Sequence, residues 1–522
     1  MPEPVSGAPS SEAVPAWPSL AVAAAALACY LAWCPKVTGD KDSPEFTLVL
    51  ATLGLSHPTG YPLYTVFGHA FVLAVHATGA TWAYAANAWS ALGGAVAIGL
   101  LHALATRLLA AAGVRSRLAP LAALPPLAAF ALNPVWTYEA TLAEVNGWHV
   151  AWAAGAALLA TALLARSAAR DRPLVRDAAL WGLVCGVGLA HHRTSVWLSA
   201  PLTLALIARW RPARAAPWLA ALAAALLPLA SYGYVAWRAA RPAEGQWPLI
   251  GPDAASVWEF VSGSGYAHYL GRFAPSDIQR DLLARDVFPW LAAALLATLA
   301  WPFARGGVPR ALRVALAASV LAQATYAFLY GVPDPSSYFL PPLALGLALV
   351  PAALAGLPAA RRAGVPLVVA GALVVAAAAW GWPRVASARV GTFSDFDRLT
   401  RSMWASIPRE HGYVIWEDDM WYRLVGYQRL ERRKPGLVVV NPMLFRNPRA
   451  RQAFRARHGF DPLGGLAPAA AAVAAAGTGA ELDPLRAAVV ENLARTGEPV
   501  LVFLPQLPSV RLLREGGTDP AK

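Results

Sequence analysis

Long runs of apolar residues, separated by short polar stretches, make up most of the chain before Pro383. A membrane-spanning helix needs about 20 mostly apolar residues, and shorter runs are common where a helix is broken. This pattern predicts an α-helical polytopic membrane protein with eleven spans, near Leu20–Cys34, Ala83–Ala105, Leu118–Leu132, Trp148–Ala165, Ala178–Ala190, Thr194–Ala208, Trp218–Trp237, Val287–Phe303, Val314–Tyr330, Pro341–Leu357 and Val365–Trp380.

The arginines predict how these helices are oriented, because short loops rich in Lys and Arg stay in the cytoplasm. Every second loop is basic, which predicts a cytoplasmic tail at residues 1–18 and an extracytoplasmic chain after residue 383. The apolar segment Tyr61–Ala77 would invert this order if it crossed the membrane. We therefore predict that it lies at the outer interface, within an outer loop of residues 35–82. The basic loops carry Arg107, Arg115, Arg117, Arg166, Arg170, Arg172, Arg176, Arg209, Arg211, Arg214, Arg305, Arg310, Arg313, Arg361 and Arg362.

The composition agrees with a protein held in a membrane. Hydrophobic residues make up 57% and charged residues 14% of the 522 positions, and the mean hydropathy is +0.44. On such a chain a net charge of +13 sets topology and meets anionic lipid headgroups, so we predict membrane lipids and no nucleic acid as partners. The three cysteines, Cys29, Cys34 and Cys185, lie in or beside apolar runs, which indicates no disulfide framework and no thiolate metal site.

The pattern changes after Pro383, and this change predicts a separate domain. Tyr413–Trp416, Leu437–Val440 and Pro499–Phe503 are short buried-strand patterns separated by helical stretches. They predict a C-terminal extracytoplasmic α/β domain of residues 384–522 with a parallel sheet, following a transmembrane domain of residues 19–383. A second long outer loop, residues 238–286, is expected to hold interfacial helices and a segment that closes over a donor.

Acidic residues in the first outer loop are the strongest candidates for chemistry. Asp40, Asp42 and Glu45 lie beside a membrane span, where carboxylates are costly without ionic partners or water. A partly dehydrated Asp42 has a raised proton affinity that suits a general base. The alternative is structural: Asp42 caps the helix that begins near Pro44, and Glu45 is its capping-box partner. For Glu45 the cap is the favoured interpretation.

Several motifs together resemble a known family. They are Asp42–Phe46, Leu53–Gly54, His57–Tyr64, Ala143–Asn146 and Asp334–Pro341. This set is similar to the protein O-mannosyltransferase family of the transmembrane protein 260-like kind, in the GT-C superfamily of glycosyltransferases that use polyprenyl-phosphate sugars. The string His57–Tyr64 beside the acidic pair is its most specific part. The resemblance covers essentially the whole membrane region and implies a GT-C-like fold.

The resemblance implies an inverting transfer of a sugar, mannose first, from a polyprenyl-phosphate donor to a hydroxyl group of a protein Ser or Thr or of an envelope glycan. Asp42 would remove the hydroxyl proton, with Glu45 as a second acidic group. His191, His192 and Arg193 would hold the donor phosphate, since a guanidinium fork and an imidazole both donate to it. The alternative is a snorkelling arginine beside two interfacial histidines.

Five further residues are expected to support the pocket. For Glu144 the alternatives are an ordinary interfacial carboxylate or an ion pair with Arg193, and for Asp334 a routine turn former. We predict no metal site, because adjacent histidines diverge on a helix and no third ligand is suitably spaced. No cofactor is predicted, although a need for a divalent ion is left open. The supporting residues are His57, Tyr61, Tyr64, Glu144 and Asp334.

Two other classes of function share this composition. A transporter or flippase of lipid-linked sugars is also polytopic and basic, but such proteins usually show internal repeats and charges near mid-membrane, and neither is found in the sequence. A non-catalytic scaffold would use the C-terminal domain as its working part. Because the polar residues gather at one face, we favour a membrane glycosyltransferase located in the inner (cytoplasmic) membrane.

Overall fold

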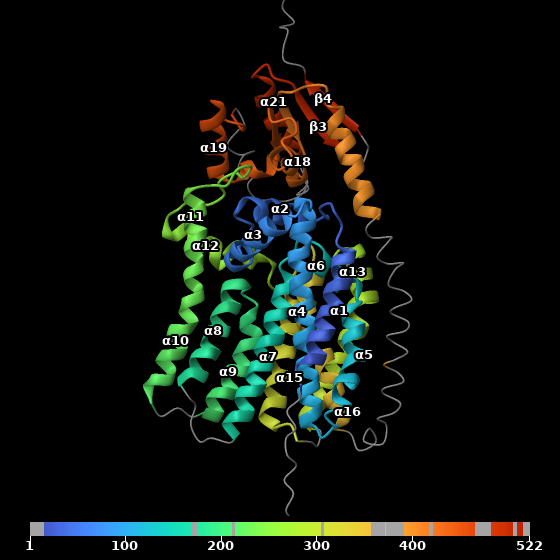
Figure 1. Cartoon of the computed structure of the whole chain (residues 1–522). Helices are drawn as coiled ribbons and strands as arrows, with labels where there is room; N and C mark the ends of the chain where they lie inside the picture. The colour runs from blue at the N-terminus through green and yellow to red at the C-terminus, as the bar shows by residue number, and fades with distance from the viewer. Residues whose placement is uncertain are drawn as a thin grey trace, which may run out of the picture.

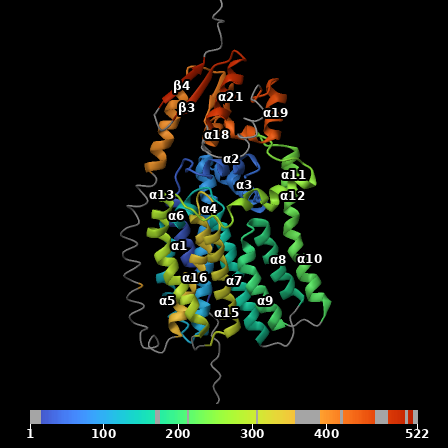
Figure 2. The same cartoon turned by 180° about the vertical axis from the view of Figure 1, so that it is seen from behind.

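The computed structural model describes residues 15–168, 175–210, 214–303, 307–356, 371, 391–416, 421–464, 482–504 and 509–514. Figure 1 shows a bundle of roughly parallel helices with a smaller α/β region at one end. Figure 2, the view from behind, shows the same arrangement.

Helices rich in Ala and Leu, which favour helical backbone, form the bundle. Prolines open several of them at the first turn, where a missing N–H removes no helical hydrogen bond. The helices are α1 (Trp17–Trp33), α2 (Ser43–Thr52), α3 (Pro62–His76), α4 (Trp82–Ala111), α5 (Ala119–Ala131), α6 (Pro134–Thr141), α7 (Asn146–Ala168), α8 (Val175–His191), α9 (Ser195–Trp210), α10 (Ala215–Leu229), α11 (Gly233–Ala240), α12 (Ala254–Ser262), α13 (Asp277–Leu282), α14 (Phe288–Ala300), α15 (Arg310–Leu329) and α16 (Leu340–Ala355).

Six helices in the described part of the chain are long and apolar enough to cross a membrane, and counting the bent pair α5–α6 as one span gives seven. Helices α1, α8 and α9 coincide with predicted spans but have only 17, 17 and 16 residues. Of the predicted span Val365–Trp380 the structure describes only residue 371. A multi-span helical membrane protein is therefore confirmed, while the count of eleven stays a prediction.

Two short helices, α2 and α3, lie at the end of the bundle that faces the α/β region (Figure 1). Helix α3 corresponds to the segment Tyr61–Ala77, for which we predicted an interfacial helix. Its 15 residues make it shorter than the helices that could span. The predicted outer loop 35–82 is thus a folded cap on the bundle, and its two helices bring the acidic motif and the His57–Tyr64 string together.

The C-terminal region contains a four-stranded sheet in the order β2-β1-β3-β4. Strands β1 (Gly412–Ile415), β2 (Leu437–Val440) and β3 (Val500–Leu504) are parallel, and β4 (Ser509–Arg514) pairs antiparallel with β3. The three parallel strands lie where the sequence predicts them. Residues 391–406 are helical. The other helices of this region are α18 (Trp421–Arg429), α19 (Pro448–His458) and α21 (Leu482–Ala494).

Candidate active site

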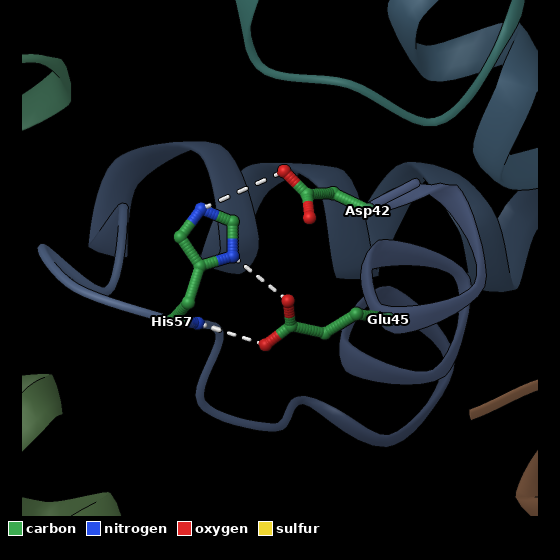
Figure 3. A group of neighbouring side chains, drawn as sticks. All are labelled: Asp42, Glu45 and His57. Carbon is green, nitrogen blue, oxygen red and sulfur yellow. Dashed lines mark hydrogen bonds and ion pairs between the residues drawn. The ribbon is translucent and has the colours of Figure 1, made fainter. Parts of the chain in front are cut away.

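Asp42, Glu45 and His57 form one group at the start of α2, as Figure 3 shows. The Glu45 carboxylate accepts two hydrogen bonds from His57, one from its backbone N–H and one from Nδ1 of the ring, each 2.8 Å long. An ionised carboxylate can only accept, so this contact places the ring proton on Nδ1. The other nitrogen, Nε2, then points to Asp42, whose Oδ2 is 4.0 Å away.

This geometry corrects the capping interpretation. Asp42 occupies the N-cap position of α2, but its backbone is helical and its side chain accepts no hydrogen bond from the first turn. Both Glu45 oxygens are engaged by His57, so Glu45 makes no capping box with Asp42. The helix start is instead specified by Pro44 in the first turn. Both carboxylates are therefore available for a role other than capping.

Neighbouring charges hold the loop before α2 in place. Lys41 forms an ion pair with Asp334 and lies 4.5 Å above the ring of Tyr138. Tyr138 in turn donates its hydroxyl to Asp40. Asp334 also accepts a hydrogen bond of 2.7 Å from the Ser336 hydroxyl, so it forms a turn, as one interpretation predicted, and anchors the acidic loop as well. Asp40 is exposed and accepts a hydrogen bond from the Tyr138 hydroxyl.

These surroundings perturb the acidity of Asp42. Burial raises its pKa, the positive charge of a protonated His57 and that of Lys41 lower it, and Glu45 and Asp334 raise it again, with a net rise. The Asp42 side chain nevertheless keeps 48% of its surface exposed, so solvent screens part of this effect. An aspartate with a raised pKa accepts a proton more readily than a free one, which is the property a general base needs.

Tyr61 connects this acidic group to the rest of the site. It lies in a tight turn in which Gly60 and Tyr61 have φ values of +84° and +40°, the left-handed region that a tyrosine rarely adopts. The turn directs the ring between two imidazoles: its centroid is 5.5 Å from that of His57 and 6.0 Å from that of His192, against which it stacks. Strained backbone of this kind is concentrated at functional sites.

A cavity of about 410 Å³ lies on the far side of Tyr61 and contains the predicted phosphate-binding arginine. None of the described carboxylates pairs with Arg193, so its guanidinium is available to an anion in the cavity. Val196 and Trp197 on α9 form an apolar part of the cavity wall, and each residue has 41% of its surface exposed. The polar wall is made by Thr59, Tyr61, His192, Arg193, Thr194, Ser262, Ser264, Tyr266, Tyr326, Tyr330 and Tyr338.

The two predicted histidines have different places. His192 lines the cavity, and burial followed by the nearby positive charges of His191, His57 and Arg193 lowers its pKa to about 3, so it is neutral at pH 7. His191 is not part of the cavity wall. It is 5% exposed and contacts the carbonyl oxygen of Val145 through Nε2 at 3.3 Å. The structure therefore groups Arg193 with His192 and sets His191 behind them.

The other predicted supporting residues lie deeper. Tyr64 packs edge-on against Phe46 at 5.4 Å between ring centroids, behind the acidic group. Glu144 is 5% exposed, and burial followed by the charges of Glu139 and Asp42 raises its pKa well above the usual range. Its backbone is held by the Ser90 hydroxyl, which contacts both its N–H and its C=O. The ion pair with Arg193 that we considered for Glu144 is not present between these two described residues.

Among the residues that the structure describes, Asp42, Glu45 and His57 also form a group that could hold a metal ion, with ligand atoms within 4.8 Å of one another. The sequence analysis missed this group because its members are separated along the chain. In the observed arrangement Glu45 accepts two hydrogen bonds from His57, and Asp42 Oδ2 lies 4.0 Å from His57 Nε2. A cation bound by all three side chains would have to displace the hydrogen bond between Glu45 and the His57 ring.

Apart from Tyr61, sequence reasoning missed the tyrosines of the cavity. Tyr266 lies within the predicted outer loop 238–286, and Tyr326 and Tyr330 lie within the predicted span Val314–Tyr330. Tyr338 belongs to one of the family-like motifs, and that was the one available signal. The rings of Tyr330 and Tyr338 are 4.9 Å apart at their centroids, so residues from either end of the loop between α15 and α16 make one wall.

Comparisons with known proteins agree with this geometry. Residues 42–214 match the family model described as the protein O-mannosyl-transferase TMEM260 N-terminal domain. Two crystal structures of ArnT from Cupriavidus metallidurans share the fold. The apo form has a TM-score of 0.53 at 12% identity, and the form bound to undecaprenyl phosphate has 0.51 at 14%. Each alignment covers 93% of this chain and 92% of that one. A comparison with curated proteins gives no match.

The chain shares its fold with ArnT, and residues 42–214 are similar to the amino-terminal domain of the TMEM260 protein O-mannosyltransferases. The matched residues include the acidic group, Tyr61 and Arg193. The resemblance seen in the motifs is thereby confirmed for this part of the chain.

Proposed function

We propose that the protein transfers a sugar, with mannose as the first candidate, from a polyprenyl phosphate to a hydroxyl group of a protein Ser or Thr or of an envelope glycan. The observation that carries this proposal is the cavity lined by both Arg193 and Tyr61, because the Tyr61 ring also lies 5.5 Å from that of His57 in the Asp42–Glu45–His57 group. A cation for a leaving phosphate and a base for an incoming hydroxyl are thus brought to one place. The reaction would occur at the extracytoplasmic face of the inner membrane.

The chemistry is a single displacement. The acceptor oxygen attacks the anomeric carbon while its proton passes to Asp42, and the bond from that carbon to the phosphate oxygen breaks. Polyprenyl phosphate leaves with the bonding electrons, and Arg193 stabilises its charge while His192 supplies a polar contact. His57 faces Asp42 through Nε2 and is held by Glu45, which keeps its ring in position. One displacement inverts the configuration at the anomeric carbon.

The shape of the cavity supports a lipid-linked donor. Its apolar side is made by Val196 and Trp197, which belong to α9 and are partly exposed, so a prenyl chain can lie along this helix while its phosphate reaches Arg193. A protein with the same fold, ArnT, was crystallised with undecaprenyl phosphate. We assign a lipid of this chemistry to the cavity, and we propose that the tyrosines lining it contact the sugar.

The test is transfer by the purified, reconstituted protein. Labelled polyprenyl-phosphate mannose and polyprenyl-phosphate glucose are offered with Ser/Thr-containing peptides and with envelope glycans, with and without a chelator. We expect Asp42→Asn to lower transfer by about 10²–10⁴-fold, the range for loss of a general base. Asp277→Asn, which removes an exposed carboxylate on α13, is the matched control and should retain activity.

Arg193 provides the second arm of the same experiment. Arg193→Lys keeps the charge but loses the planar fork, so we expect weaker binding of undecaprenyl phosphate and a smaller loss of transfer than in Arg193→Ala.

Full transfer by Asp42→Asn would exclude the proposed base. Loss of wild-type transfer in chelator would indicate that the Asp42–Glu45–His57 group holds a cation. Movement of the donor lipid across the vesicle without transfer would indicate a flippase.

A further inference from the structure

The C-terminal region contacts the acidic loop through one buried arginine. Arg423 lies on α18 and is 2% exposed, although it is 381 positions beyond Asp42 in the chain. Its guanidinium donates to the carbonyl oxygens of Thr38 at 3.0 Å and Gly39 at 2.7 Å. These carbonyls immediately precede the loop that carries Asp42. A charged group is buried so deeply only when its partners are well placed.

Asp397 fixes this arginine from the other side. It accepts a hydrogen bond of 3.0 Å from Arg423 and one of 2.7 Å from the Tyr427 hydroxyl, and it also pairs with Arg401 at 2.5 Å. Asp397 is 5% exposed. Its carboxylate therefore holds the Arg423 guanidinium in one orientation, with the remaining donors aimed at the loop. Leu48 on α2, buried within the same hydrophobic cluster as Leu424 and Val425, adds an apolar contact between α2 and α18.

The far end of the same loop has a second attachment. Gln246 pairs with the backbone of Leu55 in both directions: its Oε1 accepts from the N–H and its Nε2 donates to the C=O, each at 2.8 Å. The next residue, Trp247, packs against Phe454 of the C-terminal region at 5.6 Å between ring centroids. Residues 38–57, which contain Asp42, Glu45 and His57, are thus held at their start by Arg423 and at their end by Gln246.

We propose that Arg423 and Gln246 are positioning residues for the catalytic loop, so that the C-terminal region sets the place of Asp42 relative to the donor cavity. This inference rests on the proposed function in one respect, the role of Asp42 as the base. Neither residue lines the cavity, so neither contacts the donor. Because a displacement of about 1 Å of a reacting group can cost about 10²-fold in rate, release of either end lowers turnover without lowering donor affinity.

The first experiment separates positioning from binding. Arg423→Met and Gln246→Ala are compared with wild type in kcat, in KM for polyprenyl-phosphate sugar and in Kd for undecaprenyl phosphate. We expect kcat to fall about 10–100-fold with KM and Kd within about twofold of wild type. Arg423→Lys should recover only part of the loss, because a single ammonium cannot reach two carbonyls and Asp397 together. Arg398→Met is the matched control, since Arg398 is 77% exposed and pairs only with Asp395 among the described carboxylates.

A second measurement needs no activity. Hydrogen exchange of the full-length protein in nanodiscs should show faster exchange at residues 38–57 in Arg423→Met and Gln246→Ala, with the bundle helices unchanged. Two results would overturn the inference and leave the proposed function intact. One is transfer by both variants with the kcat of wild type, and the other is unchanged exchange at residues 38–57. Failure of wild type to transfer any sugar would instead count against the proposed function, while the exchange result would still decide the attachment. If Arg423→Met does not fold, Gln246→Ala, at the other end, decides both measurements.

Discussion

If Asp42 is the base, as we propose, its ionisation sets the pH range in which transfer can occur. Burial and the neighbouring carboxylates raise the pKa of Asp42, and the proposed base is functional only when it is deprotonated. We therefore expect kcat to fall as the pH is lowered through this raised pKa, at a pH above the ordinary aspartate value of about 3.9. A pH–rate profile of wild-type transfer checks this. A limb at or below the ordinary value would contradict the geometry.

Lys41 gives that prediction a matched pair of variants. Its positive charge lowers the pKa of Asp42, so Lys41→Gln should move the acidic limb to higher pH. Lys36, earlier in the same loop, is exposed and is not among the charges that act on Asp42, so Lys36→Gln should leave the limb in place. Equal shifts in both variants would mean that the limb reports a different group.

For single residues, the sequence predicted which side chains belong to the candidate site better than it predicted the contacts that they make. Asp42 and Tyr61 were identified from motifs, and His192 and Arg193 were identified from their donor chemistry. Tyr61, His192 and Arg193 line one cavity. The capping prediction for Glu45 was wrong because His57, twelve positions away, competes for the same carboxylate. His191 and His192 are adjacent in sequence, but a helix end sends them to different environments, which no pattern distinguishes.

Among the helices, α8 and α10 pack most closely, and glycine makes this possible. A Cβ added at Gly182 or Gly186 would collide with the carbonyl oxygens of Ala221 and Ala225. The four-residue spacing of these glycines is the small-residue pattern that brings membrane helices together. Since α8 ends at His191, directly before the turn that carries Arg193, this packing also positions the proposed phosphate-binding residues.

Replacement of one of these glycines should therefore disturb both stability and the site. We expect Gly186→Ala to destabilise the fold by about 1–3 kcal/mol, the usual range for overpacking, and to weaken binding of undecaprenyl phosphate. Thermal melting in detergent and lipid binding measure the two effects. Gly155→Ala on α7 is the control, because its added Cβ would be 3.6 Å from Leu100 and meet no obstacle. Equal melting temperatures for both variants would contradict the close packing of α8 and α10.

The elements show why some structure could be predicted and some could not. The strands at Gly412–Ile415, Leu437–Val440 and Val500–Leu504 were found from sequence because each is a short apolar run flanked by helical pattern. The segment Tyr61–Ala77 was separated from the predicted spans only by the distribution of charge over the whole chain, and its place at the interface stays a prediction. By contrast, the attachment of Arg423 to Gly39 joins elements far apart in sequence, and no periodicity records such a contact.

At the scale of the whole molecule, the α/β region must lie on the same side of the membrane as the end of the bundle that it contacts. Arg423 contacts Thr38 and Gly39, so the first loop and the C-terminal region are on the same side of any membrane. The basic loop after α4 lies at the opposite end of the bundle from α2 (Figure 1). From the placement of the arginines we predict that this loop is cytoplasmic, and we therefore propose that the candidate site and the C-terminal region lie outside.

This orientation can be tested with single cysteines in a background that lacks the three native ones. Thr78→Cys, exposed after α3, should react with a membrane-impermeant maleimide in intact cells, and so should Ser402→Cys in the C-terminal region, while Ala111→Cys at the end of α4 should react only after the membrane is opened. All three positions are on the surface, so accessibility alone does not distinguish them. Labelling of Thr78→Cys and Ser402→Cys on opposite sides would contradict the Arg423 contact. Labelling of Ala111→Cys in intact cells, with the other two cysteines protected, would be consistent with the Arg423 contact but would contradict the orientation predicted from the arginines. The proposed reaction would then occur at the cytoplasmic face.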